Sequence, residues 1–412
     1  MSWPLAKFEE VALPEKGAIV SGPFGSNIGS RFFVDEGVPV IRGNNLTFGQ
    51  RRFIDDGFVY LTEEKAQEFR NCQAIEGDLV FTAAGTIGQV GIIPPDTRFE
   101  RYIISNKQLR VRCDKNKVIP LFLFLWFTTR EMRQHIINKN SGSTIPLINL
   151  GILRGLPVPL PPLDVQREIT ATLSAYDDLI ENNRRRMALL DESVRLLYRE
   201  WFVRLRFPGH EHTRITDGVP EGWERKTALE AVSVLSGGTP KTSVPDYWDG
   251  EIPFYTPKDA TDGIWVTNCE RTVTELGLQN CNSKLYPRET VFISARGTVG
   301  KLNMTQRSMV MSQSCYALVG KDHLPQPFVY AAMQAAVDAL RQQAVGAVFD
   351  AIVVDTFKRI NLLIPSPVML RLFDETIRPI FEQVENLTLQ NQKLRTARDL
   401  LLPRLMSGEL LA

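Results

Sequence analysis

The chain contains an internal duplication, and this feature constrains its fold more than any other. A strand-like run that ends in Gly85-Thr86-Ile87-Gly88 recurs 212 residues later as a run that ends in Gly297-Thr298-Val299-Gly300. Ser21-Gly22 likewise recurs 215 residues later as Ser236-Gly237. The matches keep their order, and their offsets lie near half of the 412-residue chain. Ordered self-similarity of this kind indicates one structural unit that is present twice.

Each predicted copy combines strands with one helix. Short runs of β-branched and aromatic residues, interrupted by glycine, proline, asparagine and aspartate, are typical of strands and turns. An apolar, helix-like segment follows these runs, at 120–139 in the first copy and at 327–344 in the second. A proline-rich stretch then closes each copy, at 156–162 and 362–367. The predicted fold class is α+β, with two pseudo-repeated mixed α/β domains separated by long helices.

The segments after the two proline-rich stretches have the spacing of coiled-coil helices, because their seam residues alternate four and three positions apart. In the first segment they are Ile169, Leu173, Tyr176, Ile180, Asn183, Met187, Leu190, Val194, Leu197 and Trp201. In the second they are Phe373, Ile377, Ile380, Val384, Leu387, Asn391, Leu394, Arg398, Leu401 and Leu405. Each helix would contain about 40 residues and measure roughly 60 Å. Because each follows the same unit, we expect the two helices to pair antiparallel.

Two asparagines, Asn183 and Asn391, interrupt these seams. A lone polar residue in an apolar seam lowers stability but fixes register and partner; alternatively, each asparagine faces solvent. Pro379 should kink the second helix or delay its regular start, since proline lacks an amide donor and crowds the preceding turn. The predicted boundaries are 1–160 for the first domain, 161–205 for its helix, 206–365 for the second domain and 366–412 for the last helix.

Composition and motifs argue against catalysis in this chain. The five cysteines contain no C-x-x-C pair and the four histidines are scattered, so we predict no metal site. The loop Gly297–Lys301 lacks the full spacing of a phosphate loop, and its twin has Gln89 in place of the lysine, so both read as turn glycines. No cofactor loop or paired carboxylates stand out. The apolar stretch 121–127 is too short to span a membrane and no signal peptide is evident, which predicts a cytoplasmic protein.

Several motifs together resemble the specificity subunits of type I restriction–modification systems, over essentially the whole chain. They are Ser21-Gly22-Pro23-Phe24-Gly25-Ser26, Pro39–Leu46, Ser236-Gly237-Gly238-Thr239-Pro240, Tyr247–Pro253, Gly142–Pro146, Leu156–Leu163 and Leu401–Glu409. The resemblance implies two target-recognition domains that each read half of a split sequence in double-stranded DNA. It also implies helices that bind two methylase subunits, and a complex with restriction/translocase subunits. Adenine methylation and ATP-dependent cleavage would reside in those partners, with S-adenosylmethionine, ATP and Mg²⁺, and no cofactor in this chain.

Candidate DNA-binding residues are donors and acceptors on loops that can enter a groove. In the first domain they are Arg42, Asn44, Asn45, Gln108, Arg110, Ser143 and Thr144. Arg42, Asn44 and Asn45 either read bases or cap a turn, Gln108 and Arg110 alternate along one face, and Ser143 and Thr144 bind phosphate or form an ST-turn. In the second domain they are Thr239, Lys241, Lys258, Arg296, Gln313 and Ser314. The second copy has 345–350 in place of 141–146 and lacks the Ser/Thr pair. We therefore do not predict the same phosphate contact in the second domain.

Two further features leave alternatives open. The first long helix carries three consecutive arginines, Arg184, Arg185 and Arg186. They either form a solvated face, or contact phosphate, or bind a methylase. The chain's 48 Lys and Arg against 47 Asp and Glu weigh against DNA binding by bulk charge, and favour two modest readers that act together inside a complex. The alternatives to a DNA-reading subunit are a self-sufficient methyltransferase or nuclease and a coiled-coil adaptor that does not bind DNA.

Overall fold

The computed structural model describes residues 3–49, 51–142, 144–343 and 351–410. Contacts between residues divide the chain into two units. Unit 1 comprises Met1–Ile180 and Leu394–Ala412, and unit 2 comprises Glu181–Lys393. These units are defined by contacts, whereas the boundaries predicted above follow the repeats and stay predictions.

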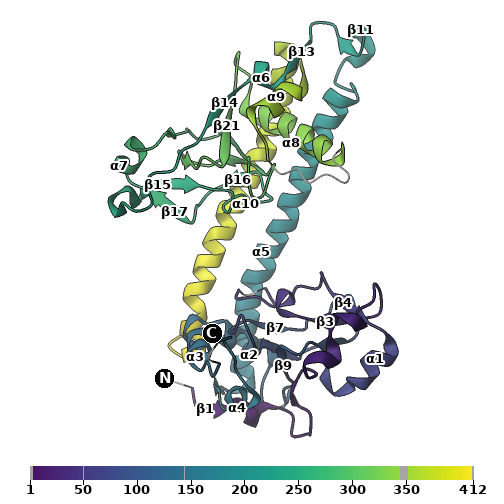
Figure 1. The fold of residues 1–412 in the computed structure, drawn as a ribbon, viewed down its shortest axis with the longest axis vertical. Coiled ribbons are helices and arrows are strands. Elements are labelled where there is room, and N and C mark those ends of the chain that lie inside the picture. Colours follow the sequence, from purple (N-terminus) through teal and green to yellow (C-terminus); the bar gives the residue numbers. More distant parts are fainter. Residues whose placement is uncertain (1–2, 50, 143, 344–350, 411–412) are drawn as a thin grey trace. The chain divides into compact units, whose positions relative to one another are not determined.

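Unit 1 contains two four-stranded sheets (Figure 1). The first has the order β2-β9-β6-β7, with antiparallel pairing throughout. Its strands are β2 (Ile19–Ser21), β9 (Gln108–Val111), β6 (Leu79–Thr82) and β7 (Val90–Ile92). The second has the order β4-β3-β8-β5, in which β3 and β8 run parallel with Ile41 opposite Ile104. Its strands are β4 (Val59–Leu61), β3 (Val38–Ile41), β8 (Tyr102–Ile104) and β5 (Gln73–Ala74).

Unit 2 repeats the central part of this topology, with sheets of five and three strands in place of four and four. Its larger sheet has the order β14-β21-β18-β19-β16, and its smaller sheet has the order β17-β15-β20 with β15 and β20 parallel. The strands are β14 (Val232–Ser236), β21 (Cys315–Gly320), β18 (Val291–Ser294), β19 (Leu302–Thr305), β16 (Trp265–Val266), β17 (Arg271–Val273), β15 (Trp248–Tyr255) and β20 (Val310–Met311). Tyr255 lies opposite Met311, as Ile41 lies opposite Ile104 in unit 1. The predicted duplication and mixed α/β class are therefore confirmed.

A pair of short strands joins the beginning of each repeat to its end. In unit 1, β1 (Leu5–Lys7) pairs antiparallel with β10 (Pro157–Pro159). In unit 2, β13 (Glu224–Thr227) pairs antiparallel with β22 (Asn361–Ile364). The proline-rich stretches are thus edge strands, where a missing amide donor is tolerated. The smaller elements are α1 (Glu63–Glu68), α4 (Leu150–Arg154), α6 (Ala228–Ala231), α7 (Glu275–Gln279), α9 (Val354–Arg359), β11 (Ile215–Thr216) and β12 (Val219–Pro220).

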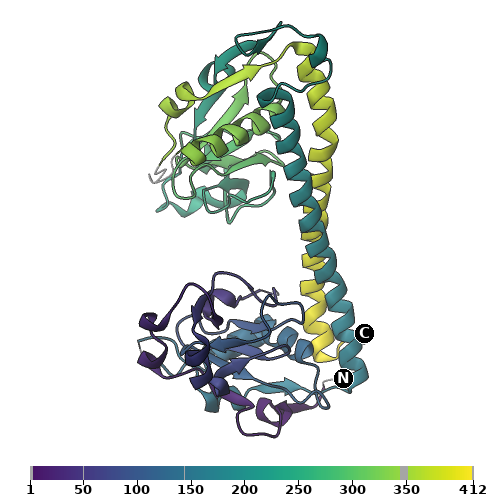
Figure 2. The ribbon, with the colours of Figure 1, turned by 90° about the vertical axis from the view of Figure 1, so that its right-hand side faces the viewer.

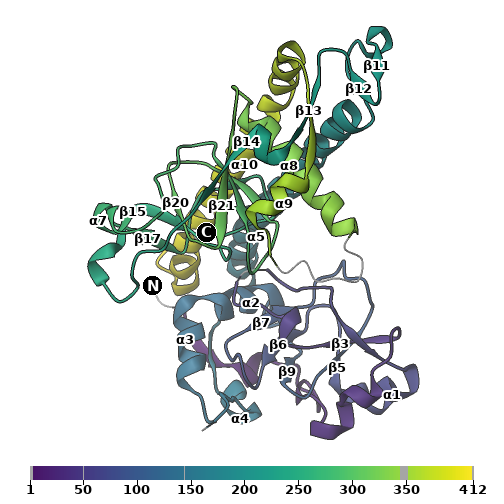
Figure 3. The ribbon, with the colours of Figure 1, turned by 45° about the horizontal axis from the view of Figure 1, so that its top comes forward.

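The helical segments within the repeats differ from each other. In unit 2, α8 (Gln326–Gln343) is one helix, and it packs against the second half of α5 through Phe328 and Tyr198 (Figure 3). In unit 1 the single helix predicted over 120–139 is wrong, because α2 (Pro120–Thr128) ends and α3 (Arg130–Asn138) begins afresh. Thr129 causes the break, since its hydroxyl accepts from the amide of Met132 and caps α3.

The two long helices are α5 (Leu163–Tyr198) and α10 (Pro367–Ser407), of 36 and 41 residues, and α5 continues as π-helix over Arg199–Val203. They lie side by side within each unit (Figure 2). In unit 2, Asn183 contacts Asn391 while Trp201 contacts Phe373, so the chain directions are opposite. The antiparallel prediction is confirmed. Of the two effects predicted for Pro379, the delayed start is wrong, because α10 begins at Pro367 and Pro379 lies within it on an exposed face. The kink stays a prediction.

Each unit builds its core around its part of the helix pair. In unit 1, the rings of Phe8, Phe81 and Phe127 lie 4.8–5.7 Å apart, and Leu173 and Leu405 join the same cluster. In unit 2, Phe202 packs edge-on against Phe373 at 4.7 Å and against Phe328 at 5.3 Å. The helices are therefore part of both hydrophobic cores, and they hold the β-sheets of each unit in place.

Candidate nucleic-acid interface

Loops from both sheets of unit 1 meet at one end of the strands. They follow β3 and β6 and connect β8 to β9. A close backbone approach holds them together. The amide of Gly22 donates to the carbonyl of Gln108 at 2.9 Å, and a Cβ on Gly22 would lie 1.9 Å from the carbonyl oxygen of Ser105. Unit 2 has the same contact, because a Cβ on Gly237 would lie 2.1 Å from the oxygen of Ser312. Only glycine fits at these two equivalent positions.

The recurring Gly-Thr-x-Gly motifs lie at this end of the sheets. Gly85 and Gly88 have φ of +91° and +93°, and Gly297 and Gly300 have φ of +79° and +78°. This left-handed conformation is that of turn glycines. The motif therefore ends a strand and starts a loop in both units.

The loops of unit 1 enclose a hollow of about 740 Å³, which we call the basin. Its lining is Ile28, Phe33, Arg42, Gly43, Asn44, Thr82, Ala84, Gly85, Thr86, Gln89, Ser105, Asn106, Lys107 and Gln108. Two of these side chains are cationic, four are amides and three are hydroxyls. No described residue of this lining carries a carboxylate. Cations suit phosphate oxygens and amides suit base edges, so this set of groups fits DNA.

Three of the predicted residues, Arg42, Asn44 and Gln108, line the basin, but Gln108 is buried and its amide oxygen accepts from the hydroxyl of Ser105. Asn45 does not line the basin. Its buried amide oxygen accepts from the backbone amide of Arg42 at 2.9 Å, and its nitrogen donates to the carbonyls of Ile54 at 3.0 Å and Asp56 at 2.9 Å. Asn45 thus has the turn-capping role, the alternative to base readout.

Arg110 also lies away from the basin. Its buried guanidinium donates to the carbonyls of Ala18 at 3.3 Å and Asn71 at 3.2 Å and lies 3.8 Å from the carboxylate of Asp78. Arg112 completes this cluster with two bonds to Asp78, of 2.9 and 2.7 Å. Burial lowers the pKa of Arg110, and the charge of Asp78 opposes that shift. The structure gives Arg110 a role in holding the sheet together.

The predicted Ser/Thr pair is only partly placed. Ser143 lies outside the described residues, as do 345–350, its counterpart segment in the second repeat. Thr144 is exposed on a loop that joins the basin's glycine turn, because the amide of Gly85 donates to the carbonyl of Pro146 at 2.9 Å. A phosphate contact at Thr144 stays a prediction.

In the corresponding loops of unit 2, a side chain caps the turn as Asn45 does in unit 1, but this side chain is a carboxylate instead of an amide. The carboxylate of Asp259 accepts from the amide of Thr256 at 2.8 Å, as Asn45 accepts from Arg42 three residues earlier. Thr298, in the glycine turn, donates to the carbonyl of Pro257 at 2.9 Å. This bond brings the loop of Lys258 beside that of Arg296, and both of these side chains are exposed.

The remaining candidates in unit 2 lie on adjoining loops. The hydroxyl of Thr239 donates to Gln313, and the carbonyl of Ser314 accepts from the amide of Ala295 at 2.8 Å. Lys241 is exposed, and its backbone carbonyl accepts from the indole of Trp248 at 3.2 Å. DNA contact by all these residues stays a prediction.

The prediction missed six polar residues that line the basin, which are Thr82, Thr86, Gln89, Ser105, Asn106 and Lys107. One signal was available in the sequence. Aligning the repeats on Ser105 and Ser312 places Lys107 opposite Ser314, which had been chosen in the second domain. Extending each choice to its counterpart in the other repeat would have found Lys107.

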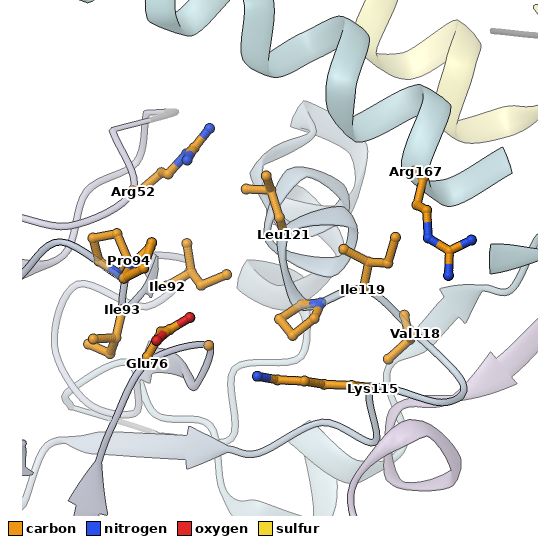
Figure 4. Close-up of a pocket in the computed structure, with 13 residues that line it drawn as sticks. Arg52, Glu76, Ile92, Ile93, Pro94, Lys115, Val118, Ile119, Leu121 and Arg167 are labelled. Atoms are coloured by element: carbon orange, nitrogen blue, oxygen red, sulfur yellow. The ribbon is translucent and has the colours of Figure 1, made fainter. Parts of the chain in front are cut away.

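Unit 1 has a second hollow, of about 390 Å³, at the opposite end of β6 (Figure 4). Arg52, Lys115 and Arg167 surround it, but its interior surface is mostly Ile92, Ile119, Leu121 and neighbouring prolines. Glu76 adds a carboxylate, and no described lining residue carries a side-chain amide. This hollow lacks the groups that read base edges, so the basin is the better candidate for DNA.

The helix pair carries polar contacts of two kinds. In unit 2, the buried amide of Asn183 donates to Asn391 at 3.0 Å, which contradicts the alternative that both face solvent. In unit 1, Arg398 pairs with Asp177 at 2.6 Å. Burial raises the pKa of Asp177, and Arg398 opposes that shift. Arg184, Arg185 and Arg186 are exposed, and the first two lie 3.4 Å from Glu181.

The described ranges contain neither a metal-binding cluster nor a membrane-spanning helix. No group of three or more His, Cys, Asp or Glu side chains is placed to hold a metal ion there. Every helix in those ranges is too short or too polar to cross a membrane.

Comparisons with known proteins agree with this arrangement. A model of the type I restriction modification DNA specificity domain matches twice, at residues 32–191 and 220–397. The chain is 24% identical to the type I restriction enzyme MjaIX specificity subunit of Methanocaldococcus jannaschii, over 90% of this chain and 87% of the relative. It is 22% identical to the HindI specificity subunit of Haemophilus influenzae, over 76% and 83%. The crystal structure of the S subunit from M. genitalium has the same fold, with a TM-score of 0.56 at 14% identity over 98% and 96%.

Proposed function

The chain belongs to the family of type I restriction modification DNA specificity proteins, and from this membership we propose that it is the DNA-reading subunit of a type I complex. Unit 1 and unit 2 each recognise one half of a split sequence in double-stranded DNA. The helices set the length of the unread spacer. The basin is the observation that carries the proposal, because it gathers amides, hydroxyls and two cations at one end of the sheets of unit 1.

The chemistry of the complex belongs to other subunits. Methylase subunits, two per complex, methylate adenine with S-adenosylmethionine, and restriction/translocase subunits cleave DNA with ATP and Mg²⁺. The complex works in the cytoplasm. Methylase docking on the helix pair is supported by the three exposed arginines at 184–186 on α5. The alternatives predict other outcomes. A self-sufficient methyltransferase modifies DNA as the purified chain alone, and a pure adaptor leaves no footprint in the assembled complex.

The spacer role is tested by lengthening both helices together. One heptad inserted between Ile180 and Glu181, and a second between Lys393 and Leu394, preserves the seam and adds about 10 Å. Mapping methylated adenines in the host should then show both half-sites unchanged and a spacer about three base pairs longer. An insertion in α5 alone is the control, because it shifts the seam residues of α5 without a matching shift in α10. An unchanged spacer in the double insertion contradicts the proposal.

A further inference from the structure

Two large apolar side chains are exposed on loops that adjoin the basin. Phe24 is 87% exposed and Ile145 is 60% exposed. The loop of Phe24 begins at Gly22, which contacts Ser105, and continues to Ile28, which lines the basin. The loop of Ile145 is held by the bond from Gly85 to the carbonyl of Pro146. Both loops are therefore attached to the wall of the basin, and neither side chain contributes to a core.

Folding gives no reason for an aromatic ring at position 24. The adjoining Gly25 has φ of +35° and a Cβ built there meets nothing within 4 Å, so this part of the loop borders open space. The corresponding residue of unit 2, two positions after the matching glycine, is Thr239, and its hydroxyl is bonded to Gln313. The two repeats share the loop but differ in what it presents. An apolar side chain of the protein next to a polar hollow indicates a ligand that presents an apolar group next to its hydrogen-bonding groups.

Base edges in the major groove have that mixed character. They present hydrogen-bond donors and acceptors together with one apolar substituent, the C5 methyl group of thymine. We propose that Phe24 contacts a thymine methyl group in the half-site read by unit 1. This inference rests on the proposed function. It adds a specificity-determining contact that the amides and cations of the basin do not provide.

Replacement of thymine by deoxyuridine tests the contact, because it removes the methyl group and leaves the pairing unchanged. The full chain in complex with its methylase partners is titrated with duplexes that carry one deoxyuridine at each thymine of the target in turn. Wild type should lose about four-fold in affinity, the effect of one buried methyl-sized group, at one position in a single half-site. Phe24→Ala should bind the thymine duplex roughly 10-fold more weakly and should no longer respond to that deoxyuridine. Phe24→Leu should keep most of the response.

Leu5→Ala is the matched control, because Leu5 is 66% exposed in β1 of the same unit and does not line the basin. It should bind and respond as wild type does. If the wild-type complex binds its target but responds to no deoxyuridine, or if Phe24→Ala keeps the response, the thymine contact is refuted and the proposed function stands. If the wild-type complex shows no preference for the DNA sequence that it methylates, the proposed function itself fails.

Discussion

Unit 1 and unit 2 share strand order, the parallel pair in the smaller sheet, the closing strands and the close approach at Gly22 and Gly237. Their loops differ. Unit 1 leaves Asn106 and Lys107 exposed at the basin, while Arg42 and Asn44 donate to the carbonyl of Gly57. Unit 2 instead bonds Thr239 to Gln313 and pairs Lys301 with Asp262. The comparison teaches that the contacts near the backbone repeat while the outward side chains vary. We therefore expect the two units to read different half-sites.

The largest effect should come from the charge of Lys107. Lys107→Glu places a carboxylate in the basin, and its repulsion of phosphate should weaken binding of the target roughly 100-fold. Lys107→Ser installs the residue of unit 2 and should reduce the slope of log affinity against log salt by about one. Fluorescence anisotropy of the assembled complex at several salt concentrations measures both. An unchanged slope would show that Lys107 does not contact phosphate.

The two turn caps should not be interchangeable, although they occupy the same place in the repeats. Asn45→Asp keeps the acceptor for the amide of Arg42 but directs a carboxylate at the carbonyls of Ile54 and Asp56. We expect a loss of about 1–3 kcal/mol in the free energy of unfolding. Asp259→Asn should cost a similar amount, because both carboxylate oxygens accept backbone amides, from Thr256 and Glu270. Calorimetry tests the pair, and a neutral exchange at either site contradicts the assignment of the cap.

The seam of unit 2 should depend on an amide pair. Asn183→Leu removes the bond to Asn391 and should lower the free energy of unfolding by about 1–2 kcal/mol. Leucine at both positions should recover the loss, since it extends the apolar seam, but should weaken the choice of register. Denaturant unfolding measures the first effect. Disulfide trapping between cysteines placed along α5 and α10 measures the second, and a single trapped register in the double variant would argue against a register role.

The seam of unit 1 should respond to pH, because an ion pair takes the place of the amides there. Burial raises the pKa of Asp177, so the folded state holds its proton more tightly than the unfolded state does. This contribution to stability is complete below the unfolded pKa and is lost as pH rises through the raised folded value. As pH rises above the unfolded pKa, the melting temperature of wild type should therefore fall relative to that of Asp177→Asn. Parallel curves would show that Asp177 titrates normally.

Periodicity and repetition predicted the long-range architecture well. The heptad spacing located both long helices and the seam asparagines, because a buried helical face needs apolar residues every three to four positions. The break at Thr129 was missed, since the apolar run around it continues and only the backbone shows the threonine capping a new helix.

The site was less predictable. Strand alternation groups Gln108 with Arg110 but does not indicate that Asp78 and two carbonyls engage Arg110. The basin forms from loops far apart in the sequence, such as those of Arg42, Gly85 and Lys107. Local pattern identifies each loop as polar. Only the parallel pairing of β3 with β8, and the position of β6 beside β9, decides which loops meet.

The close backbone approach at Gly22 and Gly237 also limits which positions can be changed when the protein is redesigned. A side chain at either position would collide with the carbonyl of Ser105 or Ser312, so a library with randomised loops must keep both glycines fixed. Exposed positions such as Phe24, Asn106 and Lys107 have no such constraint, because they contribute nothing to a core. Variants at those positions should express and fold at rates close to wild type. Selection for a new target sequence would then act on recognition alone.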